Sequence, residues 1–178
     1  MNIYYKKEGL LNEINIMRCL NHKNTLKLYE VFETEHSIYL VVDLLNGGEL
    51  VSRIQSTKKP PTYLDIVYLA KNLLEAVEHM HKEGIMHRDI KPENLLLRDE
   101  SEIYDIVLAD FGLATKIKQP MEEILFKRCG TPGFVAPEIL SYKEGKSEFY
   151  NEKCDIFSVG CLLYLLLVNK NFHFFVIF

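Results

Sequence analysis

The stretch His87-Arg88-Asp89-Ile90-Lys91-Pro92-Glu93-Asn94 decides the fold, and two shorter motifs follow it in order. These are Asp110-Phe111-Gly112 and Ala136-Pro137-Glu138. A tripeptide such as Asp-Phe-Gly arises easily by chance, whereas three motifs in one order and at these separations do not. Their carboxylates, amide and lysine are groups that position and neutralise charge. An interpretation as ordinary solvated surface loops is therefore disfavoured.

Composition and charge exclude several broad classes of protein. The chain has 178 residues, of which 48% are hydrophobic, so it is long enough for one well-buried globular domain. The formal net charge of −4 gives no overall electrostatic reason to expect a nucleic acid or an anionic membrane as a partner. The four cysteines form no Cys-x-x-Cys pair, and the amino terminus has no apolar run of signal-peptide length. We therefore expect a cytoplasmic protein with reduced thiols.

Periodic apolar residues predict a mixture of helices and strands. The longest helix is expected at 64–83, where Ile66, Leu69, Leu73, Val77 and Met80 form one apolar face and Gly84 follows as a helix-ending glycine. Runs rich in β-branched and aromatic residues predict strands. The other expected elements are a helix at 8–20, a hairpin of 26–33 and 37–44, short apolar runs at 95–97 and 106–108, and a helix at 155–168. This order predicts one α+β unit.

The three motifs and their separations resemble those of the protein kinase family, over roughly residues 8 to 166. The resemblance implies a protein-kinase-like fold, present in part. Residues 1–43 would form a partial small lobe, with one helix and a hairpin. Residues 44–168 would form a partial large lobe with catalytic and activation loops, and 169–178 a divergent apolar tail.

The resemblance also implies the roles of the catalytic residues. Asp89 would accept the proton of a substrate hydroxyl, and Lys91 would contact the transferring phosphoryl group of ATP. Asn94 and Asp110 would supply oxygen ligands to Mg²⁺ ions that bridge the ATP phosphates. Lys91 and Thr131 match the serine/threonine type of kinase, so the expected acceptor is a serine or threonine hydroxyl of a protein.

A nucleotide site is implied at the upstream residues. Glu13 matches the helix glutamate that pairs with a strand lysine, and a hinge would meet the adenine through its backbone. Leu96 would lie beneath the adenine. For Glu13 the alternative is a solvent-facing helix acid. The residues expected at the hinge are Val42, Asp43, Leu44 and Leu45.

A closer resemblance points to the calcium/calmodulin-dependent kinase group. It rests on Leu45-Asn46-Gly47-Gly48-Glu49-Leu50 and on Cys129-Gly130-Thr131-Pro132-Gly133-Phe134. In basophilic members, acids at the positions of Glu49 and Glu93 receive arginines upstream of the target residue, which implies a basic peptide substrate. The sequence contains no EF-hand loop, so control by calcium or calmodulin cannot be inferred from it.

The chain also departs from the family pattern. We expect it to be truncated at both ends, because no glycine-rich loop or strand lysine precedes Glu13 and the resemblance stops after Val168. No serine, threonine or tyrosine lies between Lys116 and Gly130. Arg88 is therefore expected to have no phosphate partner, unless Glu122 or Glu123 acts as a fixed acid in its place.

Two other functions remain open at this point. The first is a catalytically inactive kinase remnant that binds a protein through its large lobe. The second is a membrane-attached protein that uses residues 159–178. The uninterrupted apolar run Val159 to Val168 has only 10 residues, which fits a buried helix better than the ~20 that a membrane span requires.

Overall fold

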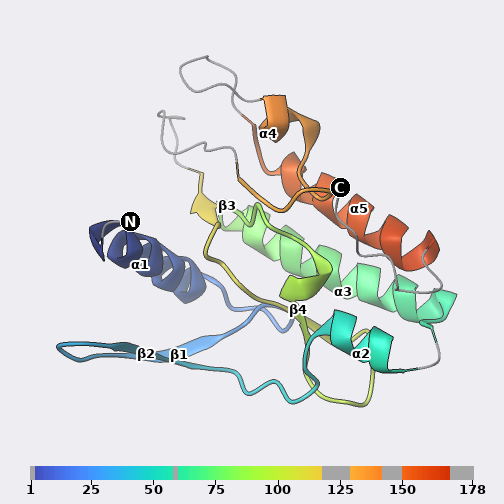
Figure 1. Ribbon diagram of the computed structural model, residues 1–178, viewed down its shortest axis with the longest axis horizontal. Coiled ribbons are helices and arrows are strands. Elements are labelled where there is room, and N and C mark those ends of the chain that lie inside the picture. Colours follow the sequence, from blue (N-terminus) through green and yellow to red (C-terminus); the bar gives the residue numbers. More distant parts are fainter. Residues whose placement is uncertain (1–2, 58–59, 118–128, 142–149, 169–178) are drawn as a thin grey trace.

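The computed structural model describes residues 3–57, 60–117, 129–141 and 150–168. Two parts are visible in Figure 1. One part holds helix α1 (Ile3–Cys19) and an antiparallel hairpin of β1 (Leu28–Glu33) and β2 (Ile38–Val42). The other holds α2 (Leu50–Ser56) and two long helices, α3 (Tyr63–Lys82) and α5 (Lys153–Val168). The chain is thus an α+β protein, as predicted.

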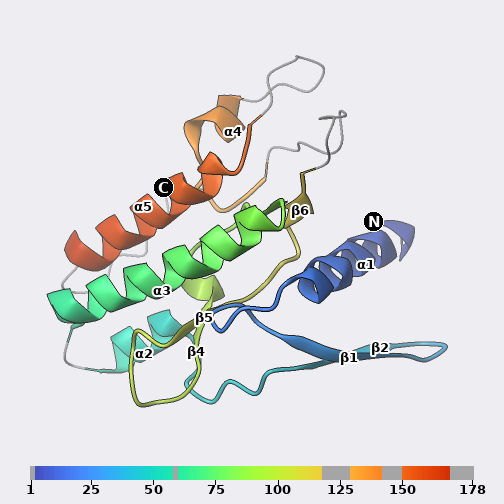
Figure 2. The same ribbon diagram turned by 180° about the vertical axis from the view of Figure 1, so that it is seen from behind.

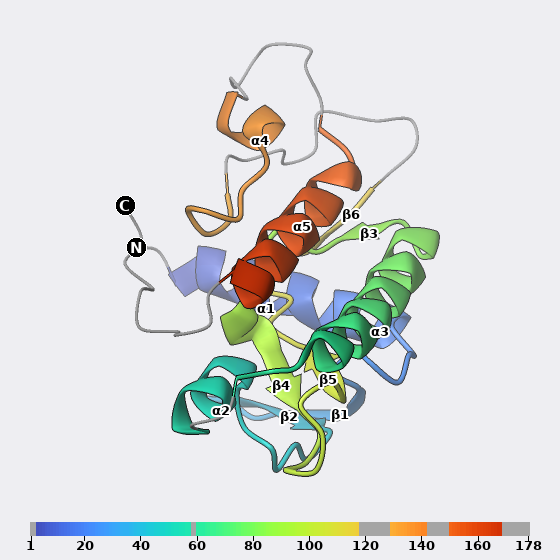
Figure 3. The same cartoon turned by 90° about the vertical axis from the view of Figure 1, so that its right-hand side faces the viewer.

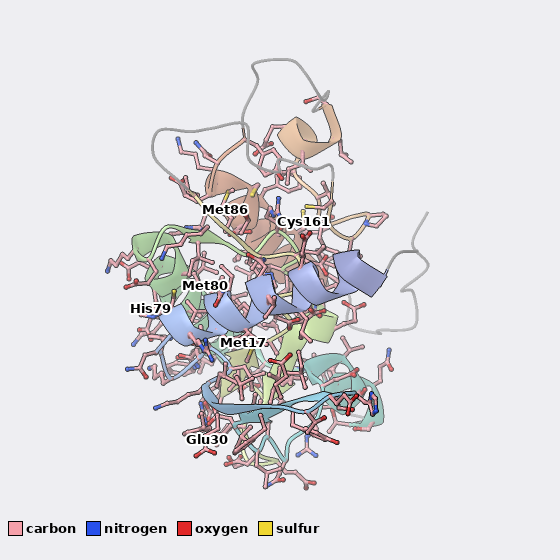
Figure 4. The ribbon with its side chains drawn as sticks, turned by 90° about the vertical axis from the view of Figure 1, so that its left-hand side faces the viewer. Met17, Glu30, His79, Met80, Met86 and Cys161 are labelled. Carbon is pink, nitrogen blue, oxygen red and sulfur yellow. The ribbon has the colours of Figure 1, made fainter. Side chains whose placement is uncertain are left out.

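The first part packs through one face of α1 and one face of the hairpin. Ile14 and Met17 of α1 are each only 3% exposed, as the apolar spacing of this helix predicts. Figure 4 shows α1 lying across the hairpin, with Met17 on the helix and Glu30 on the strand pair. The helix begins at Ile3, earlier than the expected start at residue 8.

Helix α3 forms the centre of the second part. Thr62 begins it with a capping box, since its side chain accepts a hydrogen bond from the Asp65 backbone and Asp65 accepts one from the Thr62 backbone. All five predicted apolar residues of this helix are buried. The helix ends at Lys82, and Gly84 follows with a φ of 69°, a conformation that favours glycine. The prediction for this element is confirmed.

Helix α5 runs antiparallel beside α3, as Figures 1 and 2 show from opposite sides. His81, near the end of α3, contacts Asp155, near the start of α5, at 2.8 Å. Helix α5 is apolar around most of its circumference, and its buried residues include Val159, Leu162 and Leu166. It therefore belongs to the core of this part.

Two small antiparallel sheets hold the motifs in place. Strand β4 (Leu95–Leu97) pairs with β5 (Ile106–Leu108), and β3 (Ile85–Met86) pairs with β6 (Thr115–Lys116). Strands β4 and β5 lie between the long helices and the hairpin (Figure 3). The sequence predicted β4 and β5 with their observed bounds. The two-residue strands β3 and β6 are too short to show a period.

Short elements account for most of what the sequence did not predict. These are α2, the 3₁₀ turn η1 (Pro92–Asn94) and α4 (Pro137–Ser141). Gly47, just before α2, has a packing reason, because an added Cβ would lie 2.2 Å from the Asp99 carbonyl oxygen. The predicted tail at 169–178 and the acids Glu122 and Glu123 lie outside the described residues.

None of the helices that the structure describes is long and apolar enough to cross a lipid bilayer. Helix α5 carries the apolar run in question and ends at Val168.

A pair of histidines joins the segment after α1 to α3. The rings of His22 and His79 are stacked with centroids 5.4 Å apart, and Figure 4 shows His79 near the carboxyl end of α1. His22 Nδ1 accepts a hydrogen bond from the Asn24 backbone, and His79 Nε2 accepts one from the Asn21 backbone. Both rings therefore serve as acceptors, which only unprotonated ring nitrogens can do.

The His22→Asn substitution is expected to flatten the pH dependence of the melting temperature. Burial lowers the pKa of His22 below its ordinary value of 6.5; His79 and Lys23 lower it further, and Glu75 opposes them. A lowered histidine pKa means that the unfolded chain binds more protons, so stability is highest above about pH 6.5 and falls as the pH drops. Asparagine keeps the acceptor without titrating.

Thermal unfolding of both proteins from about pH 7.5 to about pH 5.5 measures this difference. We expect it to be on the order of 1 °C, because the pair is partly exposed. His36→Asn, at an exposed position, is the matched control and leaves the slope unchanged. The buried His87, whose pKa is also lowered by burial, contributes equally to all three proteins. An equal slope in His22→Asn and wild type would contradict the prediction.

Candidate active site

The loop at 87–94 is anchored to the core by one buried carboxylate. Asp155 is 1% exposed and accepts hydrogen bonds from the backbone of His87 at 2.9 Å and of Arg88 at 2.8 Å. These bonds hold Arg88 in the left-handed region, with a φ of 67°. A non-glycine residue with this backbone costs on the order of 1–3 kcal/mol and persists only where its surroundings fix it. Asp155 supplies that constraint, and Asp89 is the next residue.

Asp89, Lys91 and Thr131 form a closed cluster. Lys91 Nζ lies 2.8 Å from Asp89 Oδ2 and donates to Thr131 Oγ1 at 2.9 Å. Thr131 Oγ1 donates in turn to Asp89 Oδ1 at 2.6 Å. The structure thus brings together three predicted site residues, one of which lies 40 positions away from Lys91 in the sequence.

The charge of Asp89 is set by two opposing effects. Burial raises the pKa of its carboxyl group, but the hydrogen bonds from Lys91 and Thr131 and the charge of Lys91 outweigh burial and lower it. The carboxylate is therefore ionised at neutral pH. An ionised carboxylate at 8% exposure can accept a proton from a hydroxyl that reaches it.

Asn94 and Asp110 supply the oxygen atoms for a hard cation. Asn94 Nδ2 donates to the Asp89 carbonyl at 2.9 Å, which commits its nitrogen and leaves its oxygen available. Asp110 is exposed, has a φ of 60°, and accepts a hydrogen bond from the Gly112 backbone. The Ala109 backbone donates to the Asn94 carbonyl at 2.9 Å, which ties the two segments together. Amide and carboxylate oxygens in this arrangement suit Mg²⁺.

A buried pair of rings joins the loop at 87–94 to the Asp110-Phe111-Gly112 motif. His87 and Phe111 are fully buried, with ring centroids 5.5 Å apart. His87 Nε2 donates to the Ala109 carbonyl and His87 Nδ1 accepts from the Asp89 backbone, so the imidazole is neutral. Burial lowers the pKa of His87 and maintains this state. Met17 of α1 is buried in the same core as Phe111.

Glu13 lies close to the Asp110-Phe111-Gly112 motif. Burial raises the pKa of its carboxyl group, the charge of Asp110 raises it further, and a hydrogen bond from the Phe111 backbone lowers it. Glu13 is half-buried rather than fully solvent-facing. Within the described ranges, it forms no ion pair with a lysine or arginine.

The hinge begins at Val42, the last residue of β2, and continues to Leu45. Asp43 is tied back to the hairpin, because its carboxylate accepts hydrogen bonds from the Lys27 backbone and the Tyr29 hydroxyl. The backbone groups of Leu44 and Leu45 make no hydrogen bond within the part of the chain that the structure describes. Leu44 is 82% exposed, whereas Val42 packs against the core. The hinge therefore offers free backbone donors and acceptors.

The predicted substrate acids lie on the surface. Glu49 and Glu93 are both exposed, Glu49 before α2 and Glu93 in η1. Glu49 also forms an isolated antiparallel bridge with Leu96 of β4. This bridge places Glu49 beside the half-buried leucine that was expected beneath the adenine.

Two residues that support the loop were not identified from the sequence. Asp155 was read only as part of an apolar helix, although an acid in such a helix signals a buried partner. No sequence pattern singles out Tyr150. Its hydroxyl accepts a hydrogen bond from Arg88 Nη1 at 2.9 Å, and Arg88 Nε donates to the Leu113 carbonyl at 2.8 Å. Arg88 thus donates to two neutral acceptors, and the expectation that it has no phosphate partner stays a prediction.

The Thr131→Val substitution is expected to raise the pKa of Asp89. Valine keeps the shape of the side chain but removes the hydroxyl that donates to the carboxylate, while the Lys91 contact remains. A titration of the Asp89 carboxyl carbon by nuclear magnetic resonance measures the direction of the change. Thr115→Val, in β6, is the control. An unchanged Asp89 pKa in Thr131→Val would show that the hydroxyl does not stabilise the charge.

Comparison with known proteins shows which family and which relatives the chain is similar to. Residues 2–175 match the family described as Protein kinase domain. The chain is 41% identical over 162 residues to "Calcium/calmodulin-dependent protein kinase type 1" of Macrobrachium nipponense and of Caenorhabditis elegans, covering 91% of this chain and 44% of each relative. It is 41% identical over 161 residues to "Myosin light chain kinase 3" of Homo sapiens, covering 90% of this chain and 19% of that relative. The chain thus spans less than half the length of these relatives.

Proposed function

Because the chain belongs to the protein kinase domain family, we propose that the protein transfers the γ-phosphate of ATP to a serine or threonine hydroxyl of a protein substrate. The observation that carries this proposal is the closed cluster of Asp89, Lys91 and Thr131. Two relatives that are named as serine/threonine-protein kinases agree with the choice of acceptor. We also propose that the protein is cytoplasmic, because this chemistry takes place in water.

The acceptor hydroxyl would be positioned and deprotonated by Asp89. The carboxylate is ionised, partly buried and held by two hydrogen-bond donors, so its direction is fixed before a substrate arrives. Such preorganisation lowers the barrier without reorganisation during the reaction. Lys91 places its ammonium group beside the same carboxylate, where negative charge from the transferring phosphoryl group would accumulate.

Asn94 and Asp110 are the residues that would hold Mg²⁺. Their available oxygen atoms and their link through the Asn94 carbonyl fit a hard cation. When bound, the metal neutralises charge on the ATP phosphates. Asp110 has a left-handed backbone, and it is exposed while the Phe111 that follows it is buried.

The adenine would bind at Val42 to Leu45, over Leu96. The unpaired backbone groups of Leu44 and Leu45 support this assignment, because a nucleotide base could supply their partners. Glu13 would face a cation near the phosphates, which its proximity to Asp110 favours. A kinase remnant without activity is the competing proposal, and the absence of an ion pair on Glu13 within the described residues is the observation that favours it.

The Asp89→Asn substitution is expected to reduce phosphoryl transfer by about 10²–10⁴-fold, because it removes the proton acceptor. Asp110→Asn is expected to abolish the stabilisation of the protein by ATP and Mg²⁺, because it removes a charged ligand of the metal. Transfer of radiolabelled γ-phosphate to a serine peptide measures the first effect. Thermal shift with a non-hydrolysable ATP analogue, with and without Mg²⁺, measures the second.

Asp99→Asn, at an exposed loop position, serves as the control for both measurements. Wild-type protein that is stabilised by Mg²⁺ and nucleotide but transfers no phosphate would support a nucleotide-binding remnant. A folded wild type with neither effect would support a binding module without a nucleotide site. Either result would overturn the proposed activity of the chain.

We propose further that the substrate carries arginines before its target residue. Glu93→Gln and Glu49→Gln are each expected to reduce the preference for a peptide with upstream arginine over the matching alanine peptide by about two- to fivefold, as for exposed ion pairs. Comparison of kcat/KM for the two peptides measures this preference. Glu78→Gln, on the exposed side of α3, is the control. Equal preferences in wild type and both variants would contradict an acidic substrate site.

A further inference from the structure

Tyr150 is a buried tyrosine that lies before α5, far in sequence from the loop that it contacts. It is 3% exposed and packs in a small core with Met86, Ala136, Ile139 and Cys154. This core includes Ala136, the first residue of the Ala136-Pro137-Glu138 motif. A buried tyrosine normally finds a hydrogen-bond partner for its hydroxyl.

The hydroxyl of Tyr150 reaches the catalytic loop through Arg88. Arg88 Nη1 donates to the Tyr150 hydroxyl oxygen at 2.9 Å, while Arg88 Nε donates to the Leu113 carbonyl at 2.8 Å. The Arg88 backbone is held by Asp155 with a φ of 67°. Both the backbone and the guanidinium group of Arg88, the residue before Asp89, are therefore held by hydrogen bonds.

The same hydroxyl lies beside the segment that carries Thr131. Cys129, two residues before Thr131, lies close enough to Tyr150 for its thiol to contribute to the raised pKa of the Tyr150 hydroxyl. Burial raises the pKa of Tyr150 to about 12 despite the nearby Arg88 charge, so the hydroxyl is neutral at physiological pH. A neutral hydroxyl can accept from Arg88 and still pair with the cysteine. Tyr150 thus lies beside Arg88, which precedes Asp89, and beside Cys129, which lies two residues before Thr131. These two segments carry the partners of the Thr131–Asp89 hydrogen bond.

We propose that Tyr150 is a positioning residue for phosphoryl transfer: through Arg88 and Cys129 it sets the distance between Asp89 and Thr131. The inference rests on the proposed kinase function. It adds a residue that lies outside the three motifs. Residues 117–128 contain no serine, threonine or tyrosine, so positioning by Tyr150 does not require phosphorylation of that stretch.

The Tyr150→Phe substitution removes only the hydroxyl oxygen. Loss of a hydrogen bond to a charged group is expected to lower kcat by about ten- to a hundredfold. The KM for ATP and the stabilisation by Mg²⁺ with an ATP analogue stay as in wild type, because the contacts of Tyr150 among the described residues are with Arg88 and a small apolar core, away from the metal and adenine residues. Tyr164→Phe, on α5 and 68% exposed, is the matched control and leaves kcat unchanged.

A double-mutant cycle with Thr131→Val separates positioning from a general loss of stability. If Tyr150 acts through Thr131 and Asp89, the effects of Tyr150→Phe and Thr131→Val on kcat are less than additive. Wild-type kcat in Tyr150→Phe would overturn the inference. A kcat that falls only in proportion to the folded fraction, with additive effects in the cycle, would overturn it as well.

The role of Tyr150 can be tested even if the wild-type chain transfers no phosphate. That result would contradict the proposed function, and crystal structures of wild type and Tyr150→Phe would then decide the role of Tyr150. The wild type has 2.6 Å between Asp89 Oδ1 and Thr131 Oγ1. A separation beyond about 3.5 Å in Tyr150→Phe, outside hydrogen-bonding range, would support positioning, and an unchanged separation would refute it.

Discussion

Everything at the candidate active site depends on the buried carboxylate of Asp155. It receives two backbone N–H groups from the loop at 87–94 and a third contact from His81 of α3. A buried charge is costly unless it is fully hydrogen-bonded, and these contacts satisfy that requirement while fixing the loop to two helices at once. The position of Asp89 is thus determined by a residue that has no part in the chemistry itself.

Much of the site could be predicted because its reactive groups lie in short, recognisable stretches. Asp89, Lys91 and Asn94 occur within six positions, so any fold of this loop keeps them close. Burial of the predicted face of α3 was equally accessible, since a long apolar period leaves one arrangement that removes it from water. The family comparison confirms the kinase fold inferred from these motifs.

The supporting contacts could not be predicted, because they join residues that are distant in sequence and ordinary in type. Nothing local distinguishes Tyr150 from an exposed tyrosine such as Tyr164, and only the folded chain brings it to Arg88. Helix α2 was missed for a different reason: it has seven residues and no side-chain cap, so its stability comes from burial of Leu50 and Ile54. Short elements of this kind are set by tertiary packing.

The left-handed backbones of Arg88 and Asp110 have a consequence for how the protein responds to heat. Both conformations store free energy, and the surrounding hydrogen bonds maintain them only while the core stays closed. A local opening that frees Asp155 would let the Arg88 backbone relax at a smaller cost than global unfolding. Inactivation by warming should therefore be a local event that precedes melting, with the helices still formed while the loop has already lost its shape.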